Sequence, residues 1–258
     1  MADWLYHLPV VWMALVVFAG TALVTGVVYG AVRALATGGR ALAFKAVSSV
    51  TITPLVVVFG LLVGFLAAQV WSDAQRATAA VAQEASALRT VVLLATSFPG
   101  ATEVCIRALV RRHIQDAVSQ EWPAMTRQQA TLTVIPAAVT EALQLTLSAL
   151  PQSPAQTLAR REMVSALQSA LDARRERIII SRSVINWVKW AVVILLAVLI
   201  LLTIAIVHSD NRAAAAIAMA LFAIGVAACV VLVASHNRPF TGEISVGPEL
   251  LLQVMPKE

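Results

Sequence analysis

The side chains that most often carry catalysis are scattered along this chain. Its histidines, His7, His113, His208 and His236, lie far apart, and His113 is followed at helical spacing by a carboxylate, Asp116. We interpret His113 and Asp116 as a surface ion pair in preference to a metal site, because a metal needs further ligands. The spacings of a zinc hydrolase, a nucleophile elbow and a phosphate-binding loop do not occur. We therefore expect no catalysis, no metal and no other cofactor.

A second set of residues is suited to moving ions across an apolar barrier. Between residues 46 and 71, one side of a helix carries a stripe that is polar at its ends and apolar in the middle. The stripe consists of Thr51, Leu55, Val58, Leu62, Phe65 and Gln69. Such a stripe can line a pore that closes by dewetting of its apolar constriction. It can equally face lipid, which the periodicity alone favours. Pro54 is expected to bend this helix.

The stripe lies in one of four long apolar stretches of the sequence. They cover 9–32, 46–71, 190–207 and 213–235, about 18 to 26 residues each, which is enough to cross ~30 Å of hydrocarbon. The apolar fraction is 59% and the charged fraction only 13%, whereas about a quarter of the residues in soluble domains are charged. The first stretch is too long for a signal peptide, so we expect it to remain attached. The chain is predicted to be an integral membrane protein.

The four stretches form two pairs around a polar segment. We predict an all-α fold with a first transmembrane hairpin over 1–71, a helical soluble domain over 72–183, a second transmembrane hairpin over 184–235 and a tail over 236–258. Within 72–183, apolar residues recur at three- and four-residue spacing, as on one face of a helix. The net charge of +5 is not gathered into a basic tract with aromatic neighbours, which argues against nucleic acid as a partner.

Turn and capping residues set the expected helix ends. Gly38-Gly39 marks the turn of the first hairpin, and Asp210 or Asn211 can cap the helix that begins at Ala213.

Ser153 and Pro154 form a helix start signal. No helix breaker follows before Trp190, so we expect this helix to run straight into the third span. The second span is expected to continue in the same way past Trp71.

Glycines in the first two spans are placed one helical turn apart. Gly26 and Gly30 form one such pair, and Gly60 and Gly64 form another. Glycine pairs at this spacing let two helix backbones approach closely in lipid. We favour packing within the chain over self-association.

Charged residues of the polar segment point to ion pairing between helices. Every basic residue in 72–183 is an arginine, and arginine favours bidentate, partly buried pairs. We expect Glu84 to pair with an arginine, with a solvated charged face as the alternative.

At the start of the third span, Asn186, Trp187, Lys189 and Trp190 are interpreted as an interfacial belt with a snorkelling lysine. The alternative places Lys189 at the mouth of an anion path.

Near its start, the tail contains the sequence Asn237-Arg238-Pro239-Phe240-Thr241-Gly242. Its proline, glycine and phenylalanine predict a fixed turn that brings Arg238 and Phe240 back against the soluble domain.

This tail, together with Glu121-Trp122, the segment 84–89 and the pair Arg174 and Arg177, resembles a bacterial family of bestrophin-like membrane proteins, along the whole chain. The most specific part is Arg238, Pro239, Phe240 and Gly242. Asn237 stands where the family pattern leads us to expect an aspartate.

The resemblance implies a homo-oligomeric, pentameric ion channel of the bacterial inner membrane, with the second span lining the pore and Val58, Leu62 and Phe65 forming its neck. It also implies that the soluble domain and both termini are cytoplasmic. The charges do not decide this orientation: Arg33, Arg40 and Lys45 of the first loop favour a cytoplasmic loop, whereas a count near all span ends favours a cytoplasmic domain. The sequence has no acidic cluster for a calcium clasp.

The alternative hypothesis is a non-conducting membrane scaffold or sensor whose helical domain docks a partner. A transporter is disfavoured, because no acidic residue lies within a span.

Overall fold

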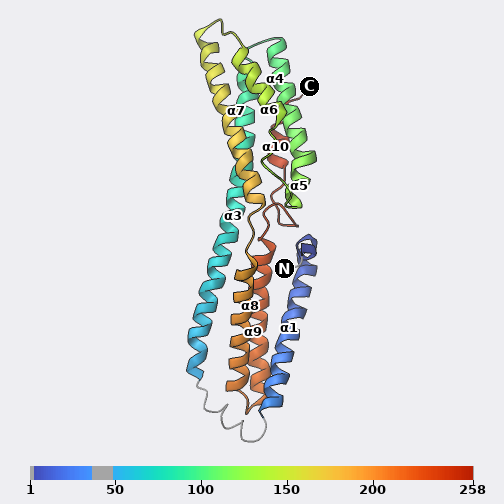
Figure 1. Cartoon of the computed structure of the whole chain (residues 1–258), viewed down its shortest axis with the longest axis vertical. Coiled ribbons are helices and arrows are strands. Elements are labelled where there is room, and N and C mark those ends of the chain that lie inside the picture. Colours follow the sequence, from blue (N-terminus) through green and yellow to red (C-terminus); the bar gives the residue numbers. More distant parts are fainter. Residues whose placement is uncertain (1–2, 37–48, 258) are drawn as a thin grey trace. The chain divides into compact units, whose positions relative to one another are not determined.

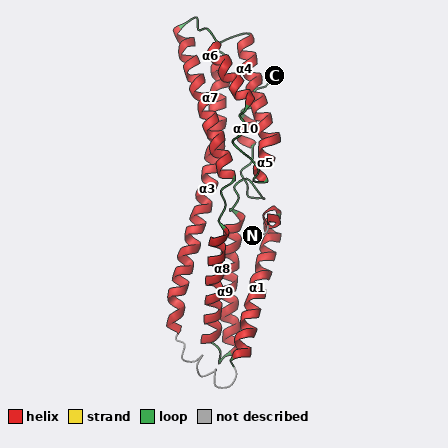
Figure 2. Ribbon diagram, viewed as in Figure 1, coloured by secondary structure: helices red, strands yellow, loops and turns green. Residues whose placement is uncertain are grey.

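A computed structural model of the chain describes residues 3–36 and 49–257. In this part of the chain all regular structure is helical, which confirms the all-α prediction (Figure 2). The expected turn at Gly38-Gly39, the charges Arg40 and Lys45, and residues 46–48 of the second predicted span lie outside the described residues.

The helices long and apolar enough to cross a membrane are those the sequence predicts, two before and two after the polar segment. They are α1 (Val10–Leu35), α3 (Ile52–Ala95), α8 (Trp187–Val207) and α9 (Arg212–Ser235). Short 3₁₀ helices, η1 (Asp3–His7) and η2 (Ser49–Thr51), precede α1 and α3. The chain is thus a multi-pass membrane protein by the length and composition of its helices.

The chain divides into two compact units. The membrane unit comprises residues 1–71, 184–237 and 242–244, and the central unit comprises 72–183, 238–241 and 245–258. The tail therefore contributes residues to both.

In the membrane unit, α1 packs against α8 and α9, which also pack against each other (Figure 1). Small and β-branched residues such as Val193, Ile200 and Ala227 form the buried contacts. The first part of α3 meets α9 through the rings of Phe59 and Phe222, whose centroids are 5.9 Å apart.

The central unit is a bundle of helices from α3 onward. Its elements, besides the second half of α3, are α4 (Ala101–Asp116), the π-helix η3 (Ala117–Glu121), α5 (Trp122–Thr126), α6 (Ala137–Ser148), α7 (Pro154–Ser181) and α10 (Glu249–Gln253). The residues expected on its apolar faces, such as Leu88, Ile114 and Leu167, are fully buried in one core.

The expected capping residues are confirmed. Ser153 Oγ accepts a hydrogen bond from Gln156 N–H at 3.2 Å, and Asn211 Oδ1 accepts one from Ala214 N–H at 3.1 Å. Each satisfies a main-chain donor that the first turn of a helix leaves unpaired.

One expected continuity is confirmed and the other is wrong. The second span does continue past Trp71, within the single helix α3. In contrast, α7 ends at Ser181 and α8 starts anew at Trp187, with Asn186 as its cap. The break is stabilised from far along the chain, because Ile185 N–H donates to Asn237 Oδ1 at 2.8 Å.

Pro54, which was expected to bend the second span, lies close to the start of α3, where the helix can accommodate it without a bend. The α-helix begins at Ile52, so Pro54 lies in its first turn, where a missing N–H costs no helical hydrogen bond.

Candidate functional site

The stripe predicted on α3 is only partly free of contacts within the chain. Val58 and Phe65 are 52% and 65% exposed, whereas Leu55 and Leu62 pack partly against the core of the membrane unit. The face buried beside them carries Phe59. The apolar middle of the stripe is therefore open to lipid, to water or to another subunit at Val58 and Phe65.

A positive charge lies beside one polar end of this stripe. Lys189 Nζ donates to Gln69 Oε1 at 2.6 Å, while Thr51 at the other end is exposed. The interpretation of the α8 start as an interfacial belt stays a prediction for exposed Trp187 and is wrong for Trp190. Asn186 caps the helix, and Trp190 is buried, with only 5% of its surface exposed.

The interpretation of the paired glycines as sites of close packing within the chain is wrong. At Gly26, Gly30, Gly60 and Gly64, no atom of the described residues, apart from the adjoining backbone of the same helix, lies within 4 Å of the position that a Cβ would occupy. These glycines face open space in the single chain.

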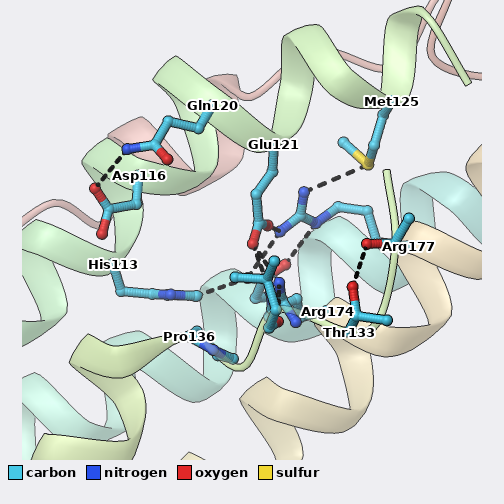
Figure 3. A network of polar contacts seen from close by, with 12 residues as sticks. His113, Asp116, Gln120, Glu121, Met125, Thr133, Pro136, Arg174 and Arg177 are labelled. Atoms are coloured by element: carbon cyan, nitrogen blue, oxygen red, sulfur yellow. Dashed lines mark hydrogen bonds and ion pairs between the residues drawn. The ribbon is translucent and has the colours of Figure 1, made fainter. Parts of the chain in front are cut away.

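The central unit contains a buried network of charges (Figure 3). Arg177 donates from Nε to Glu84 Oε2 at 2.8 Å and from Nη2 to Glu84 Oε1 at 3.2 Å, and both side chains are fully buried. The same Nη2 also donates to Glu121 Oε2 at 2.8 Å. The expected pairing of Glu84 with an arginine is confirmed.

Further contacts close the network around this pair. His113 Nε2 lies 3.0 Å from Glu84 Oε1, and Arg174 Nε donates to Glu121 Oε1 at 2.7 Å. The Arg177 guanidinium lies 4.5 Å from the centre of the Trp122 ring, a cation–π distance. Each buried charge therefore has a partner, which buried charges require.

The charged side chains of the network belong to four separate elements. Glu84 comes from α3 and His113 from α4, while Arg174 and Arg177 lie three residues apart on α7 and so share one face. Glu121 is the last residue of the π-helix η3, which follows α4 directly. Because a π-helix has a wider turn than an α-helix, the Glu121 side chain points in a different direction than it would if α4 continued regularly. The network thus fixes the mutual packing of α3, α4 and α7 inside the central unit.

The interpretation of His113 and Asp116 as a surface ion pair is wrong. His113 is 2% exposed and bonds to Glu84, while Asp116 accepts from Gln120. A sequence signal for this was present, because His113 follows Val110 by three residues on the apolar face of α4. Within the described residues, no group of three His, Cys, Asp or Glu side chains is arranged to hold a metal ion.

The network shifts the pKa values of its central pair. Burial alone would raise the pKa of Glu84, but the charge of Arg177 and the hydrogen bond with His113 outweigh it, so the pKa lies below its ordinary value. Burial alone would lower the pKa of Arg177. The negative charges and hydrogen bonds of Glu84 and Glu121 outweigh burial, so the pKa of Arg177 lies above its ordinary value. Both groups therefore stay charged, and the network is suited to structural coupling between helices.

The tail folds back against the central unit as predicted. Phe240 is 3% exposed and meets the Trp122 ring edge-on, with centroids 5.9 Å apart. Thr126 Oγ1 donates to Phe240 O at 3.2 Å, Thr241 Oγ1 donates to Thr126 O at 2.9 Å, and Trp122 Nε1 donates to Val246 O at 3.2 Å. The aromatic pair and these hydrogen bonds make the tail part of the central core.

Two tail residues have roles in the membrane unit. Gly242 has φ of +94°, a left-handed conformation that other residues rarely adopt, and a Cβ there would lie 3.1 Å from Tyr6 O. Asn237 accepts from Ile185 N–H and donates through Nδ2 to Tyr6 Oη at 3.0 Å. An aspartate could accept the first hydrogen bond but not donate the second, so the amide fits both partners as they stand.

A family model described as a bestrophin-like domain matches residues 19–251. The fold is also that of a solved structure, the crystal structure of a bacterial Bestrophin homolog from Klebsiella pneumoniae that carries a point mutation. The two align with a TM-score of 0.71 over 94% of this chain and 97% of the other, at 10% sequence identity. No curated protein matches the chain in sequence.

Proposed function

The chain belongs to the bestrophin-like family, and from this premise we propose that it forms a homo-oligomeric ion channel, a pentamer in the bacterial inner membrane. The observation that carries the proposal is the partly uncovered apolar stripe of α3, with Val58 and Phe65 exposed in the single chain. In the proposed assembly this stripe lines the central axis. Its apolar middle is the neck, where a narrow dewetted segment sets the barrier to ions.

The contact between Lys189 and Gln69 supports anions as the permeant ions. It places a positive charge beside the polar end of the stripe. A charge at a pore mouth raises the local concentration of counter-ions. Replacing Lys189 with glutamine should therefore shift the reversal potential in a chloride gradient towards lower anion preference, and an unchanged reversal potential would contradict this assignment.

Ion flux through liposomes that contain the purified protein tests conduction. Phe65→Ala should raise flux, because a smaller apolar side chain widens the neck and eases its wetting. Leu23→Ala is the matched control, since Leu23 is 71% exposed in the membrane unit but belongs to α1 and not to the stripe of α3. Absence of flux from both the wild type and Phe65→Ala, or an equal rise in the control, would overturn the proposal.

The orientation that goes with this function places the central unit and both termini in the cytoplasm. The loop between α8 and α9 then faces outward. A single cysteine at Asp210, in a protein whose Cys105 and Cys229 are replaced, should react with a membrane-impermeant maleimide added to intact cells. Protection of this cysteine until the cells are lysed would reverse the orientation.

A second candidate function is a non-conducting scaffold, and one feature of the central unit favours it. Large apolar side chains are uncovered there, including Leu150 at 85% exposure, Ile135 at 72% and Val134 at 66%. Exposed apolar residues mark a contact surface where they form a continuous patch, as the neighbours Val134 and Ile135 could in part. A stoichiometric partner recovered with the full-length protein, together with a monomeric or dimeric mass, would favour this function over conduction.

A further inference from the structure

A cavity of the central unit is lined by both charged and hydrocarbon side chains. It has a volume of about 360 Å³ and lies among α4, η3, α7 and the segment that joins α5 to α6. Its lining includes the polar residues His113, Asp116, Glu121 and Arg174 and the apolar residues Ile135 and Ile178. A mixed lining of this kind is suited to a small ligand that has a charged group and an apolar part.

One nitrogen of the buried His113 ring is unused. His113 is 2% exposed, and its Nε2 lies 3.0 Å from Glu84 Oε1, a carboxylate oxygen that accepts the Nε2 proton. In the neutral ring, Nδ1 then carries a lone pair that needs a donor. Nδ1 has no donor among the described residues, yet unlike Gln128 Nε2 it keeps accessible surface. Because the ring lines the cavity, Nδ1 is open towards it.

A negative charge without a counter-charge lies one helical turn further along α4. Asp116 is half-buried and lines the same cavity, and Gln120 Nε2 donates to its Oδ1 at the long distance of 3.4 Å. Among the described residues, no lysine or arginine forms an ion pair with Asp116. Residues three apart in a helix share one face, so the Asp116 carboxylate and the His113 ring are neighbours.

The π-helix brings a further carboxylate to the cavity. η3 starts directly after Asp116, and because the hydrogen bonds of a π-helix join residues five apart, Glu121 projects to the same side as Asp116 (Figure 3). The charge of Glu121 is already matched, since it accepts from Arg174 Nε at 2.7 Å and from Arg177 Nη2 at 2.8 Å. The unmatched charge of the lining is therefore that of Asp116.

We propose that this cavity binds a small organic cation with a primary ammonium group and a short hydrocarbon chain. One N–H donates to the Asp116 carboxylate and another to His113 Nδ1, while the hydrocarbon chain packs against Ile178. A metal ion is a poorer occupant, because no three His, Cys, Asp or Glu side chains of the described residues are placed to hold one. An anion is disfavoured by the charge of Asp116.

A set of related probes tests the chemistry of the site on the wild-type protein. Butylamine carries a positive charge at neutral pH, as a lysine side chain does. Titrated into the full-length protein in detergent and followed by calorimetry, it should fill one site per chain, with a Kd on the order of 1 mM for so small a ligand. Butanol and butyrate keep the hydrocarbon chain and should bind about tenfold more weakly. Absence of a saturable site, or tighter binding of butyrate, would overturn the proposal.

Butyltrimethylammonium separates the hydrogen bonds from the charge. It keeps the hydrocarbon chain and the positive charge of butylamine but has no N–H group. It should therefore bind the wild type about tenfold more weakly than butylamine does. Equal binding of the two cations would show that no N–H donor is recognised, and would contradict the assigned contacts with His113 and Asp116.

Asp116→Asn tests the location of the site. The substitution removes the charge and keeps the shape of the side chain, so Tm should change little while butylamine binds about tenfold more weakly. Asp172→Asn is the matched control, because Asp172 is an exposed carboxylate of α7 that does not line the cavity, and it should bind butylamine as the wild type does. Equal affinity of Asp116→Asn and the wild type would mean that the amine binds elsewhere or to detergent, and would overturn the proposal. These assays measure binding and not flux, so their outcome is separate from that of the conduction tests.

Discussion

The two units of this protein use their side chains in opposite ways. The central unit buries Glu84, His113 and Arg177 and gives each a partner within the same chain. The membrane unit leaves Phe65 65% exposed, and among the described residues it leaves open space at the Cβ positions of Gly60 and Gly64 on α3. The packing of the central unit is thus determined by ion pairs within one chain. In the membrane unit, by contrast, exposed apolar helix surface remains to be covered by lipid or by other copies of the chain.

The largest expected effect comes from breaking the buried network. Glu84→Ala leaves Arg177 buried with a single carboxylate partner, Glu121, and should lower the free energy of unfolding by about 3 to 5 kcal/mol. Thermal unfolding in detergent, followed by near-ultraviolet circular dichroism, measures this loss.

The control is an ion pair of the same unit that water reaches. Arg112 and Glu141 are 3.5 Å apart and about half exposed, so Glu141→Ala should change stability by less than about 1 kcal/mol. An equal loss of unfolding free energy in Glu84→Ala and Glu141→Ala would show that burial does not make the first ion pair more stabilising than the second.

A smaller loss is expected from removing the aromatic contact of the tail. Phe240→Ala leaves a cavity beside Trp122 and should cost about 3 kcal/mol. Ile244→Ala serves as the comparison, because Ile244 is 49% exposed and should be nearly neutral. Tryptophan fluorescence, followed during unfolding, measures the stability of both variants. An unaffected Phe240→Ala protein would show that the tail is not part of the central core.

Acid should weaken the central unit through Glu84. Its pKa in the folded protein lies below the ordinary value of 4.5, so its stabilising effect is present above that pH and is lost as pH falls through the folded-state value. The slope of Tm against pH below about pH 5 should be shallower in Glu84→Gln than in the wild type. Glu141→Gln should keep the wild-type slope, and an unchanged slope in Glu84→Gln would assign the acid sensitivity to other carboxylates.

The smallest effect on the chain itself is expected at the glycines of the membrane unit. Gly64→Ala adds a Cβ that meets no described neighbour and replaces a poor helix former, so it should stabilise the folded chain by up to about 1 kcal/mol. If this face joins subunits, the same change should reduce the oligomeric mass measured by light scattering. A clear loss of chain stability would instead reveal close packing within one chain.

Features that depend on neighbouring residues were predictable from the sequence. The four spans follow from the length of the apolar stretches, and the continuity of α3 past Trp71 follows from the absence of a breaker. The caps at Ser153 and Asn211 follow from side-chain chemistry close to the helix start.

Features that depend on distant residues were not predictable in the same way. The break after Ser181 is stabilised by Asn237, and the burial of His113 depends on Glu84 from another helix. The pairing of Glu84 with an arginine was expected from residue type, but the choice of Arg177 and the part played by Glu121 depend on the π-helix turn. The residues of the proposed pore and the assembly they imply stay predictions.

The contacts of Trp122 also set an order for the protein's biogenesis. Its ring packs against Phe240 and its indole N–H donates to Val246 O, yet the ribosome makes both residues only after the whole second hairpin. While α8 and α9 are synthesised, Trp122 therefore lacks these two contacts and keeps its contact with Arg177. A chain that stops at Ser235 would therefore lack the aromatic contact and the hydrogen bond that the tail supplies to the core of the central unit.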